Sequence, residues 1–332
     1  MKHLILLVVT ISLLMTACNT SIAPTEPSTQ PEANVMTDPQ LTIHPDRENC
    51  SVPTASKECL LTYKVIGNRK LRLYFLPPLQ QVYEKAPIIF MFPGGGLMAC
   101  DMMSPYAIYA TELDAIRNAG FATVTIDYRI GGANGEGVTP HEIVSDCMDA
   151  MRYISYYSEI LGVDPQKIVT TGHSAGGMLS LLTAYAPHDF FDADGYWPEA
   201  DFGVVGAFAL SAHGIYYKGD GPYDGYYSRT SPDTSLWSTE ELRQLCTTTN
   251  YVKNGGVPCT ILIGTHDEWV APEGIALFEA ACEEGGVECR VVWFQNADHG
   301  FASANGQPVT PDYNATRATI TSFATECVQN AG

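Results

Sequence analysis

Residues 172–176 read Gly-His-Ser-Ala-Gly, and this Gly-x-Ser-x-Gly stretch decides the fold that the chain is expected to adopt. The five residues before it, 167–171, are typical of a short β-branched strand, and residues 177–182 after it are typical of the start of an apolar helix. A serine on so sharp a strand-to-helix turn has its hydroxyl exposed, and small neighbours are needed because the turn is tight. The stretch therefore predicts that Ser174 is a nucleophile with partners elsewhere in the chain.

Those partners follow in a consistent order. Residues 259–264 are typical of a buried strand and lead to Asp267, and residues 291–294 are typical of a last strand and lead to His299. A serine hydroxyl is a weak nucleophile at neutral pH, so it needs an imidazole base, which in turn needs a carboxylate to fix its tautomer. The order of serine, acid and histidine predicts a catalytic triad of Ser174, Asp267 and His299.

Neighbouring residues compete for two of these roles. Glu268 could replace Asp267 as the acid, although Asp267 has the better offset from its strand. His299 is the only histidine after Asp267. We expect His173, beside the serine, to be a packing residue, and Asp298, beside the base, to be a loop residue.

A glycine run supplies a fourth component. Residues 87–92 are typical of a buried strand, and Pro93-Gly-Gly-Gly follows them. Such a run is otherwise a flexible turn, but residues without side chains also let backbone N–H groups approach an oxyanion closely. We expect the N–H groups of Gly95, Gly96 and Ala175 to form an oxyanion hole.

With these motifs the chain resembles the α/β-hydrolase superfamily, and within it the hormone-sensitive-lipase-like and carbohydrate-esterase-like branch. The resemblance covers most of the chain after the first sixty residues, and it includes Asp-Tyr-Arg at residues 127–129. One departure is Pro93, where the branch usually has the histidine of His-Gly-Gly-Gly. The resemblance implies Ser174 as nucleophile, His299 as base and Asp267 as acid.

The implied activity is that of a serine carboxylic-ester hydrolase that works through an acyl-enzyme, with no cofactor and no metal. Short-acyl (acetyl) or feruloyl esters of carbohydrates are the expected substrates, as small molecules or oligosaccharides. Two alternatives stay open: a serine peptidase resembling the prolyl oligopeptidase catalytic domain, and a non-catalytic surface binding protein on a hydrolase scaffold. The filled triad positions argue against the second.

Strands that alternate with helices predict an α/β fold with a mostly parallel, doubly wound sheet and helices on both faces. We expect an antiparallel entry hairpin over residues 60–66 and 70–76, and single helices over 107–119, 140–161 and 315–327. The active site of such a sheet lies at the carboxyl ends of its strands.

An aromatic-rich insertion, residues 212–253, interrupts this rhythm. It could form a wall for a sugar or an aromatic acyl group, or pack its own tyrosines against the body, and the same choice applies to the aromatic residues between 190 and 197. The possible substrate contacts in the insertion are Tyr216, Tyr217, Tyr226, Tyr227 and Trp237.

Composition supports a single catalytic domain. The 332 residues are 45% hydrophobic and 17% charged, which suits one α/β domain with a full core. The net charge of −19 argues against nucleic acid as a partner, because such binding needs a basic patch.

The N-terminus predicts export. Residues 1–18 contain an apolar run too short to span a bilayer and end in a stretch that resembles a bacterial lipobox at Cys18. Residues 19–40 are rich in Ser, Thr, Pro and Glu and are expected to be a disordered tether to a catalytic domain at 41–332. We expect an exported protein that contacts a bacterial membrane only through this lipid anchor, or is otherwise secreted.

Nine cysteines beyond Cys18 also favour an oxidising compartment. Local spacing makes disulfide pairs plausible, although connectivity cannot be deduced from sequence. Metal binding is the weaker interpretation, because the chain has no Cys-x-x-Cys motif or Cys/His cluster. The plausible pairs are Cys50–Cys59, Cys246–Cys259, Cys282–Cys289 and Cys100–Cys147, with Cys327 left over.

Overall fold

The computed structural model describes residues 44–131, 135–191, 195–212, 244–270 and 272–331. Within these ranges no helix is both long enough and apolar enough to cross a membrane. The aromatic-rich insertion falls largely outside them.

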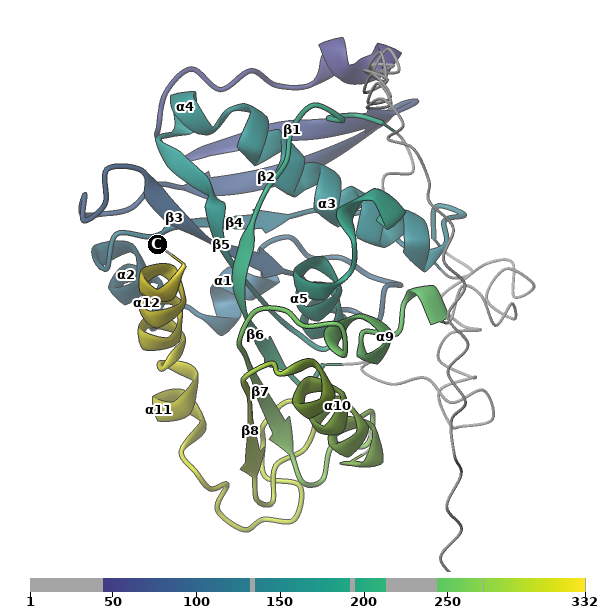
Figure 1. Ribbon diagram of the computed structural model, residues 1–332, viewed down its shortest axis with the longest axis vertical. Coiled ribbons are helices and arrows are strands. Elements are labelled where there is room, and N and C mark those ends of the chain that lie inside the picture. Colours follow the sequence, from purple (N-terminus) through teal and green to yellow (C-terminus); the bar gives the residue numbers. More distant parts are fainter. Residues whose placement is uncertain (1–43, 132–134, 192–194, 213–243, 271, 332) are drawn as a thin grey trace, which may run out of the picture. The chain divides into compact units, whose positions relative to one another are not determined.

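An eight-stranded sheet forms the centre of the fold, with strand order β1-β2-β4-β3-β5-β6-β7-β8 (Figure 1). The first two strands form the expected antiparallel hairpin, β2 pairs antiparallel with β4, and all later pairings are parallel. Strands β3 and β4 are buried throughout, as expected where helices cover both faces. The strands are β1 Cys59–Ile66, β2 Arg69–Leu76, β3 Ala86–Phe92, β4 Ala122–Ile126, β5 Val163–His173, β6 Val204–Leu210, β7 Cys259–Gly264 and β8 Cys289–Phe294.

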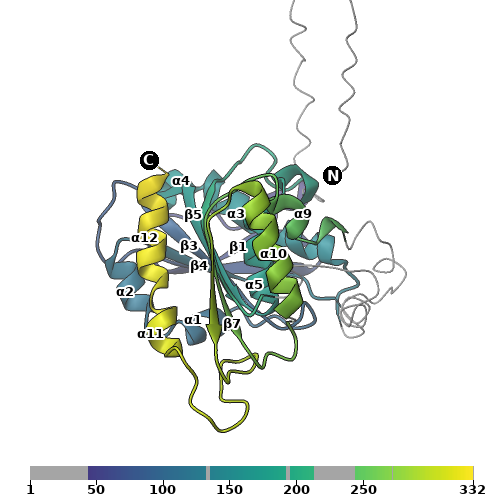
Figure 2. The same cartoon turned by 60° about the horizontal axis from the view of Figure 1, so that its bottom comes forward.

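Helices cover both faces of the sheet. Figure 2 shows α1, α2 and α12 on one side of it and α3, α5 and α10 on the other. The helical segments are η1 Pro45–Asn49, α1 Ser104–Ile108, α2 Leu113–Asn118, α3 Pro140–Tyr156, α4 Ser158–Leu161, α5 Ala175–Tyr185, η2 His188–Phe191, α9 Thr249–Val252, α10 Pro272–Gly285, α11 Tyr313–Arg317 and α12 Ile320–Asn330. The prediction of a mostly parallel sheet with helices on both faces, an α/β-hydrolase fold, is confirmed.

Three helices expected to be continuous are each divided in two. The helix predicted over 107–119 breaks after Ile108, where Tyr109 turns inward and its hydroxyl bonds to the Thr171 hydroxyl at 2.7 Å. The segment 140–161 breaks at Tyr157, whose ring packs with Trp197. The segment 315–327 is interrupted between α11 and α12. Tertiary packing decides the first two breaks, and helix periodicity alone carries no signal of it.

A buried charge network ties the hairpin to α3. The Lys64 ammonium lies 2.8 Å from Asp146 Oδ1 and 2.6 Å from Asp149 Oδ2, and all three side chains are fully buried. Arg129 completes it, with Nε and Nη2 each 2.8 Å from an oxygen of Asp146. Each buried charge thus has an opposite partner, as burial requires. The network fixes the start of the loop after β4, which lies beside the candidate active site.

Candidate active site

Ser174 lies on the tight turn between β5 and α5. Its backbone is at φ 60° and ψ −124°, a conformation that L-residues adopt only under constraint, and its N–H donates to Leu210 O at 2.9 Å. The flanking glycines are required by space, since a Cβ at Gly176 would lie 2.1 Å from Phe92 O and one at Gly172 would lie 2.6 Å from it. The turn therefore holds Ser174 at the carboxyl end of β5, with 9% of its surface exposed.

Asp267 and His299 meet across the loops that follow β7 and β8. His299 Nδ1 lies 2.9 Å from both carboxylate oxygens of Asp267. The two loops are joined because His266 N–H donates to Ala297 O at 2.8 Å. The acid and the base predicted from sequence are thus hydrogen-bonded partners in the structure.

The surroundings of Asp267 keep it ionised. Its side chain is fully buried, and burial alone would raise the pKa of this carboxyl. Hydrogen bonds from His299 and from the N–H groups of Trp269 and Val270, at 2.9 and 3.0 Å, outweigh burial and hold the pKa below its usual value. A carboxylate can only accept, so His299 Nδ1 carries a proton, and in the neutral ring Nε2 is then the acceptor nitrogen.

The residues next to Asp267 and His299 do not take part in the acid–base pair. Glu268, the competing acid, is exposed, as is His266. Asp298 Oδ1 accepts hydrogen bonds from Gly300 N–H and Ala302 N–H, both at 2.9 Å, and so shapes the loop that carries His299.

His173 does more than the expected packing. Its Nε2 lies 2.8 Å from His299 O, and since a carbonyl only accepts, Nε2 carries the ring proton and donates it. The ring centroids of His173 and His299 are 4.9 Å apart, so the serine turn and the histidine loop lie side by side. Burial lowers the pKa of His173 and so favours the neutral ring, although the hydrogen bond to His299 O acts in the opposite direction. Adjacency to the serine was the only sequence signal for this contact.

The glycine run lies against the serine turn. A Cβ at Gly94 would be 2.8 Å from His173 O and 3.5 Å from Ser174 Cβ, so no side chain fits there. Gly95 and Gly96 have φ of 115° and 62°. Among the described residues, the N–H groups of Gly95, Gly96 and Ala175 have no hydrogen-bond acceptor. The glycine run thus meets the serine turn at Gly94, Gly95 and Gly96 follow with positive φ, and Ala175 directly follows Ser174 as the first residue of α5.

Tyr128 holds the glycine run in place through its hydroxyl group. Its hydroxyl, in a fully buried side chain, lies 2.8 Å from Pro93 O and 3.3 Å from Gly94 O and donates to them. Gly131 N–H donates to Leu97 O at 2.8 Å on the far side of the run. Pro93 replaces the histidine of the related motif, and here its carbonyl is the anchored group. The Asp-Tyr-Arg motif thus joins the glycine run to the buried charge network through Arg129.

Several residues named from the sequence lie outside the described part of the chain. Cys18 and all five proposed substrate contacts of the insertion lie outside the described residues: Tyr216, Tyr217, Tyr226, Tyr227 and Trp237. Of the aromatic residues between 190 and 197, Phe191, Tyr196 and Trp197 belong to the core, and Trp197 Nε1 donates to Tyr63 O at 2.9 Å. Packing is therefore the correct interpretation for these three. Trp269, which sequence reasoning missed, is 43% exposed with its ring centroid 6.4 Å from that of His299.

The cysteines form none of the predicted disulfides in the described residues, although Cys282 and Cys289, one of the predicted pairs, do lie together. All nine in the described residues carry free thiols, so none of the pairs inferred from spacing is formed as a disulfide in this structure. The pairing of Cys246 with Cys259 is also wrong in its grouping. Cys259 lies with Cys282 and Cys289, whereas Cys246 belongs to a different part of the core. Sequence spacing failed here because sheet register brings Cys259 next to Cys289.

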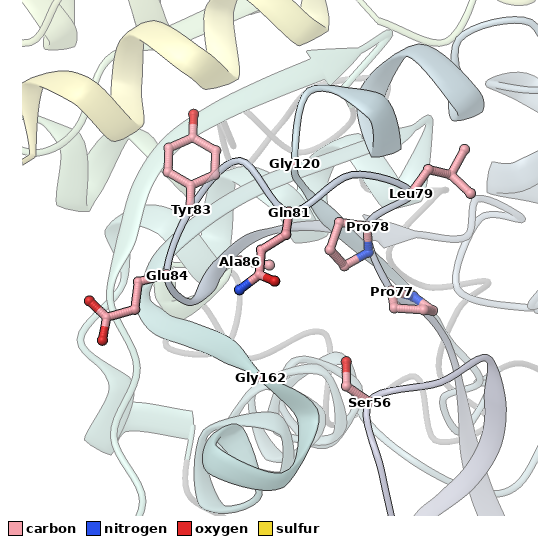
Figure 3. A pocket seen from close by; sticks show the side chains of 10 residues that line it. All are labelled: Ser56, Pro77, Pro78, Leu79, Gln81, Tyr83, Glu84, Ala86, Gly120 and Gly162. Atoms are coloured by element: carbon pink, nitrogen blue, oxygen red, sulfur yellow. The ribbon is translucent and has the colours of Figure 1, made fainter.

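A cavity of about 430 Å³ lies elsewhere in the molecule (Figure 3). Its lining includes Ala86 at the start of β3 and Gly162 just before β5, so it opens at the amino ends of these strands. Ser174 lies at the opposite end of β5. This cavity is therefore separate from the candidate active site.

Comparison with known proteins agrees with this geometry. Esterase 2 of Thermogutta terrifontis, solved with propionate bound, superposes with a TM-score of 0.63 and 25% identity, over 83% of this chain and 94% of that one. The probable carboxylic ester hydrolase LipM of Mycobacterium tuberculosis is 32% identical over 134 residues, which is 40% of this chain and 28% of LipM. The non-reducing polyketide synthase atr1 of Stereocaulon alpinum is 29% identical over 136 residues, 39% of this chain and 5% of the synthase. The chain thus spans only a small part of these two curated relatives.

A family model gives the most specific match. The BD-FAE model matches residues 74–281, more than half of the chain, and the matched segment includes Ser174 and Asp267. The chain therefore belongs to the BD-FAE family of α/β-hydrolase esterases.

Proposed function

We propose that this protein is a serine carboxylic-ester hydrolase, with Ser174 as nucleophile, His299 as general base and Asp267 as the acid that orients it. One observation carries the proposal: His299 Nδ1 is 2.9 Å from a buried, ionised Asp267. The loop that carries His299 is in turn joined to the serine turn by the His173 ring. A histidine held in this way has Nε2 available to take a proton from a hydroxyl.

The reaction follows from these protonation states. Ser174 Oγ attacks the ester carbonyl while His299 Nε2 takes its proton, and Asp267 stabilises the imidazolium that forms. The N–H groups of Gly95, Gly96 and Ala175 donate to the oxyanion of the tetrahedral intermediate. His299 then protonates the leaving alcohol, and water activated by the same imidazole releases the acid and restores Ser174.

The proposed substrates are short-acyl (acetyl) or feruloyl esters of carbohydrates. Membership of the BD-FAE family supports this class. The related Thermogutta esterase was solved with propionate and with butyrate, which supports a short acyl group. Trp269, exposed beside His299, offers an aromatic surface for a sugar or a feruloyl ring.

The test is an assay of the purified protein on p-nitrophenyl acetate, butyrate and octanoate, on methyl ferulate and on acetylated xylan oligosaccharides. We expect turnover of the short esters and loss of at least 10⁴-fold in kcat for Ser174→Ala. Ser180→Ala is the matched control, because Ser180 lies on the same helix and its hydroxyl bonds only locally, to Gly177 O at 2.8 Å. A folded protein that cleaves prolyl peptides but no ester would contradict the proposal, as would an active Ser174→Ala variant.

We also propose that residues 1–18 direct export and that Cys18 is lipidated. Support comes from the sequence alone, in the short apolar run followed by the lipobox-like stretch. Expression in a Gram-negative host with radiolabelled palmitate should label the wild type in the membrane fraction and leave Cys18→Ala unlabelled. Equal labelling of the two, or a cytoplasmic wild type, would refute this.

A further inference from the structure

Three thiols from separate elements converge at one edge of the sheet. The Sγ atoms of Cys259, Cys282 and Cys289 all lie within 4.8 Å of one another. Cys259 and Cys289 are the first residues of β7 and β8 and are direct partners in the parallel register. Cys282 comes from the last turn of α10, which leads into β8. The cluster thus joins two strands and the helix that covers them.

The cluster is buried in apolar surroundings. Cys259 and Cys282 are each 1% exposed, Cys289 is partly buried, and Phe278 and Val287 belong to the same core cluster. Among the residues that the structure describes, no histidine or carboxylate joins the three cysteines as a further ligand. Of the histidine, cysteine and carboxylate ligands in the described residues, an ion held here would therefore meet only the three thiols.

The geometry suits an ion with three sulfur ligands. A metal ion in the plane of three sulfurs, about 2.3 Å from each, holds the sulfurs about 4 Å apart. The three Sγ atoms already lie within 4.8 Å of one another, so only a small contraction is needed. Zinc in structural sites takes four ligands, and a fourth protein ligand is missing from the described cluster. Thiolates select soft ions such as Cu(I).

We propose that Cys259, Cys282 and Cys289 form a binding site for one soft, thiophilic metal ion of the Cu(I) type. The ion would tie α10 to the amino ends of β7 and β8, at the opposite end of these strands from Asp267 and His299. Its effect is therefore expected on stability rather than on ester turnover. Binding should release protons, because cysteines that bind a metal ion do so as thiolates.

The experiment uses the reduced full-length protein, solubilised in detergent under anaerobic conditions, and Cu(I) supplied from a chromophoric Cu(I) chelator. We expect one equivalent of Cu(I) to be retained, Tm to rise, and copper-edge X-ray absorption to show only sulfur neighbours at about 2.3 Å. Cys282→Ala should lower Cu(I) affinity at least 100-fold. Cys246→Ala is the matched control, since Cys246 is equally buried but lies outside the cluster.

Three results would overturn the proposal. The first is no retention of Cu(I) by the reduced wild type. The second is a nitrogen or oxygen shell in the absorption spectrum, a readout that needs no variant and stays decisive if Cys282→Ala does not fold. The third is a disulfide between two of the three cysteines in the isolated protein, found by peptide mapping, together with no Cu(I) uptake after reduction.

Discussion

The two ends of β7 and β8 carry opposite kinds of chemistry. At the carboxyl ends Asp267 and His299 form a polar pair, bonded at 2.9 Å and supported by backbone N–H groups. At the amino ends three sulfurs lie among apolar side chains, with no histidine or carboxylate ligand in the described cluster. The same two strands therefore position a hydrogen-bonded polar pair at one end and a cluster of buried thiols at the other.

This difference has a physical origin. Loops at the carboxyl end are free of the ladder pattern, so their N–H groups can turn toward a carboxylate, as Trp269 and Val270 do. The amino ends are covered by α10, whose last turn contributes Cys282. Substitutions at the carboxyl ends should change turnover with little effect on folding, and substitutions at the amino ends should do the reverse.

Among substitutions at the ends of β7 and β8, the largest effect is expected from Asp267→Asn. The amide oxygen can still accept from Trp269 N–H and Val270 N–H, so the loop keeps its shape. The amide NH₂, however, favours a His299 tautomer with its proton on Nε2, which cannot then accept one from Ser174. We expect kcat to fall about 10³- to 10⁴-fold with Tm nearly unchanged, measured by ester hydrolysis and thermal unfolding.

The control for this substitution is Glu268→Gln, next to Asp267 and exposed, which should keep full activity. If Asp267→Asn lost less than tenfold in kcat, or if Glu268→Gln lost as much as Asp267→Asn, then Asp267 would not be the orienting acid.

An intermediate effect, on stability rather than on turnover, is expected from Gly285→Ala at the end of α10 that covers the amino ends of the strands. A Cβ at Gly285 would lie 2.2 Å from Val252 O, so the end of α10 must shift, at about 2–3 kcal/mol of unfolding free energy. Gly286→Ala is the matched control: it has φ 67° with nothing within 4 Å, so it should lose only about 1 kcal/mol from its backbone conformation.

Both glycine variants should keep wild-type kcat at temperatures where they are folded. Denaturant unfolding gives the stabilities, and ester hydrolysis gives the turnover. Equal stabilities for the two variants would show that α10 yields to the extra methyl group. A fall in kcat for either would show that the two strand ends are coupled.

Local pattern predicted much of the fold. Strands β4 and β6 are apolar runs bounded by turn residues, and a mostly parallel sheet followed from alternating strands and helices. The helix breaks near Tyr109 and Tyr157 were missed because contacts with Thr171 and Trp197 produce them. Those partners are distant in sequence, so periodicity carries no signal of them.

The candidate site shows the same limit. Ser174, Asp267 and His299 could be named from motif order, since each follows a strand. The support from Tyr128 and His173 could not, because it depends on which loops meet above the sheet. The three-cysteine cluster was missed for the same reason: Cys259 and Cys289 are thirty residues apart and become neighbours only through the register of β7 and β8.

The smallest effect is expected from His173→Phe, which removes one contact between the carboxyl end of β5 and the loop that carries His299. A phenyl ring keeps most of the packing but cannot donate to His299 O, and losing this hydrogen bond should cost about 1 kcal/mol. We expect kcat to fall about tenfold because the base is less well positioned. Activity equal to wild type would mean that His173 only packs.

Stability measured against pH gives this variant a second readout. Burial lowers the pKa of His173 in the folded state below its ordinary 6.5, so below pH 6.5 the unfolded chain binds the proton more readily. Stability from the neutral ring is therefore complete above pH 6.5 and is lost as pH falls towards the folded-state pKa. Guanidinium unfolding between pH 8 and 5 should show a shallower loss for His173→Phe than for wild type. His188, whose pKa burial also lowers, acts in the same direction in both proteins, so only the difference between the two curves reports on His173. Parallel curves would mean that the His173 ring is not held neutral against His299.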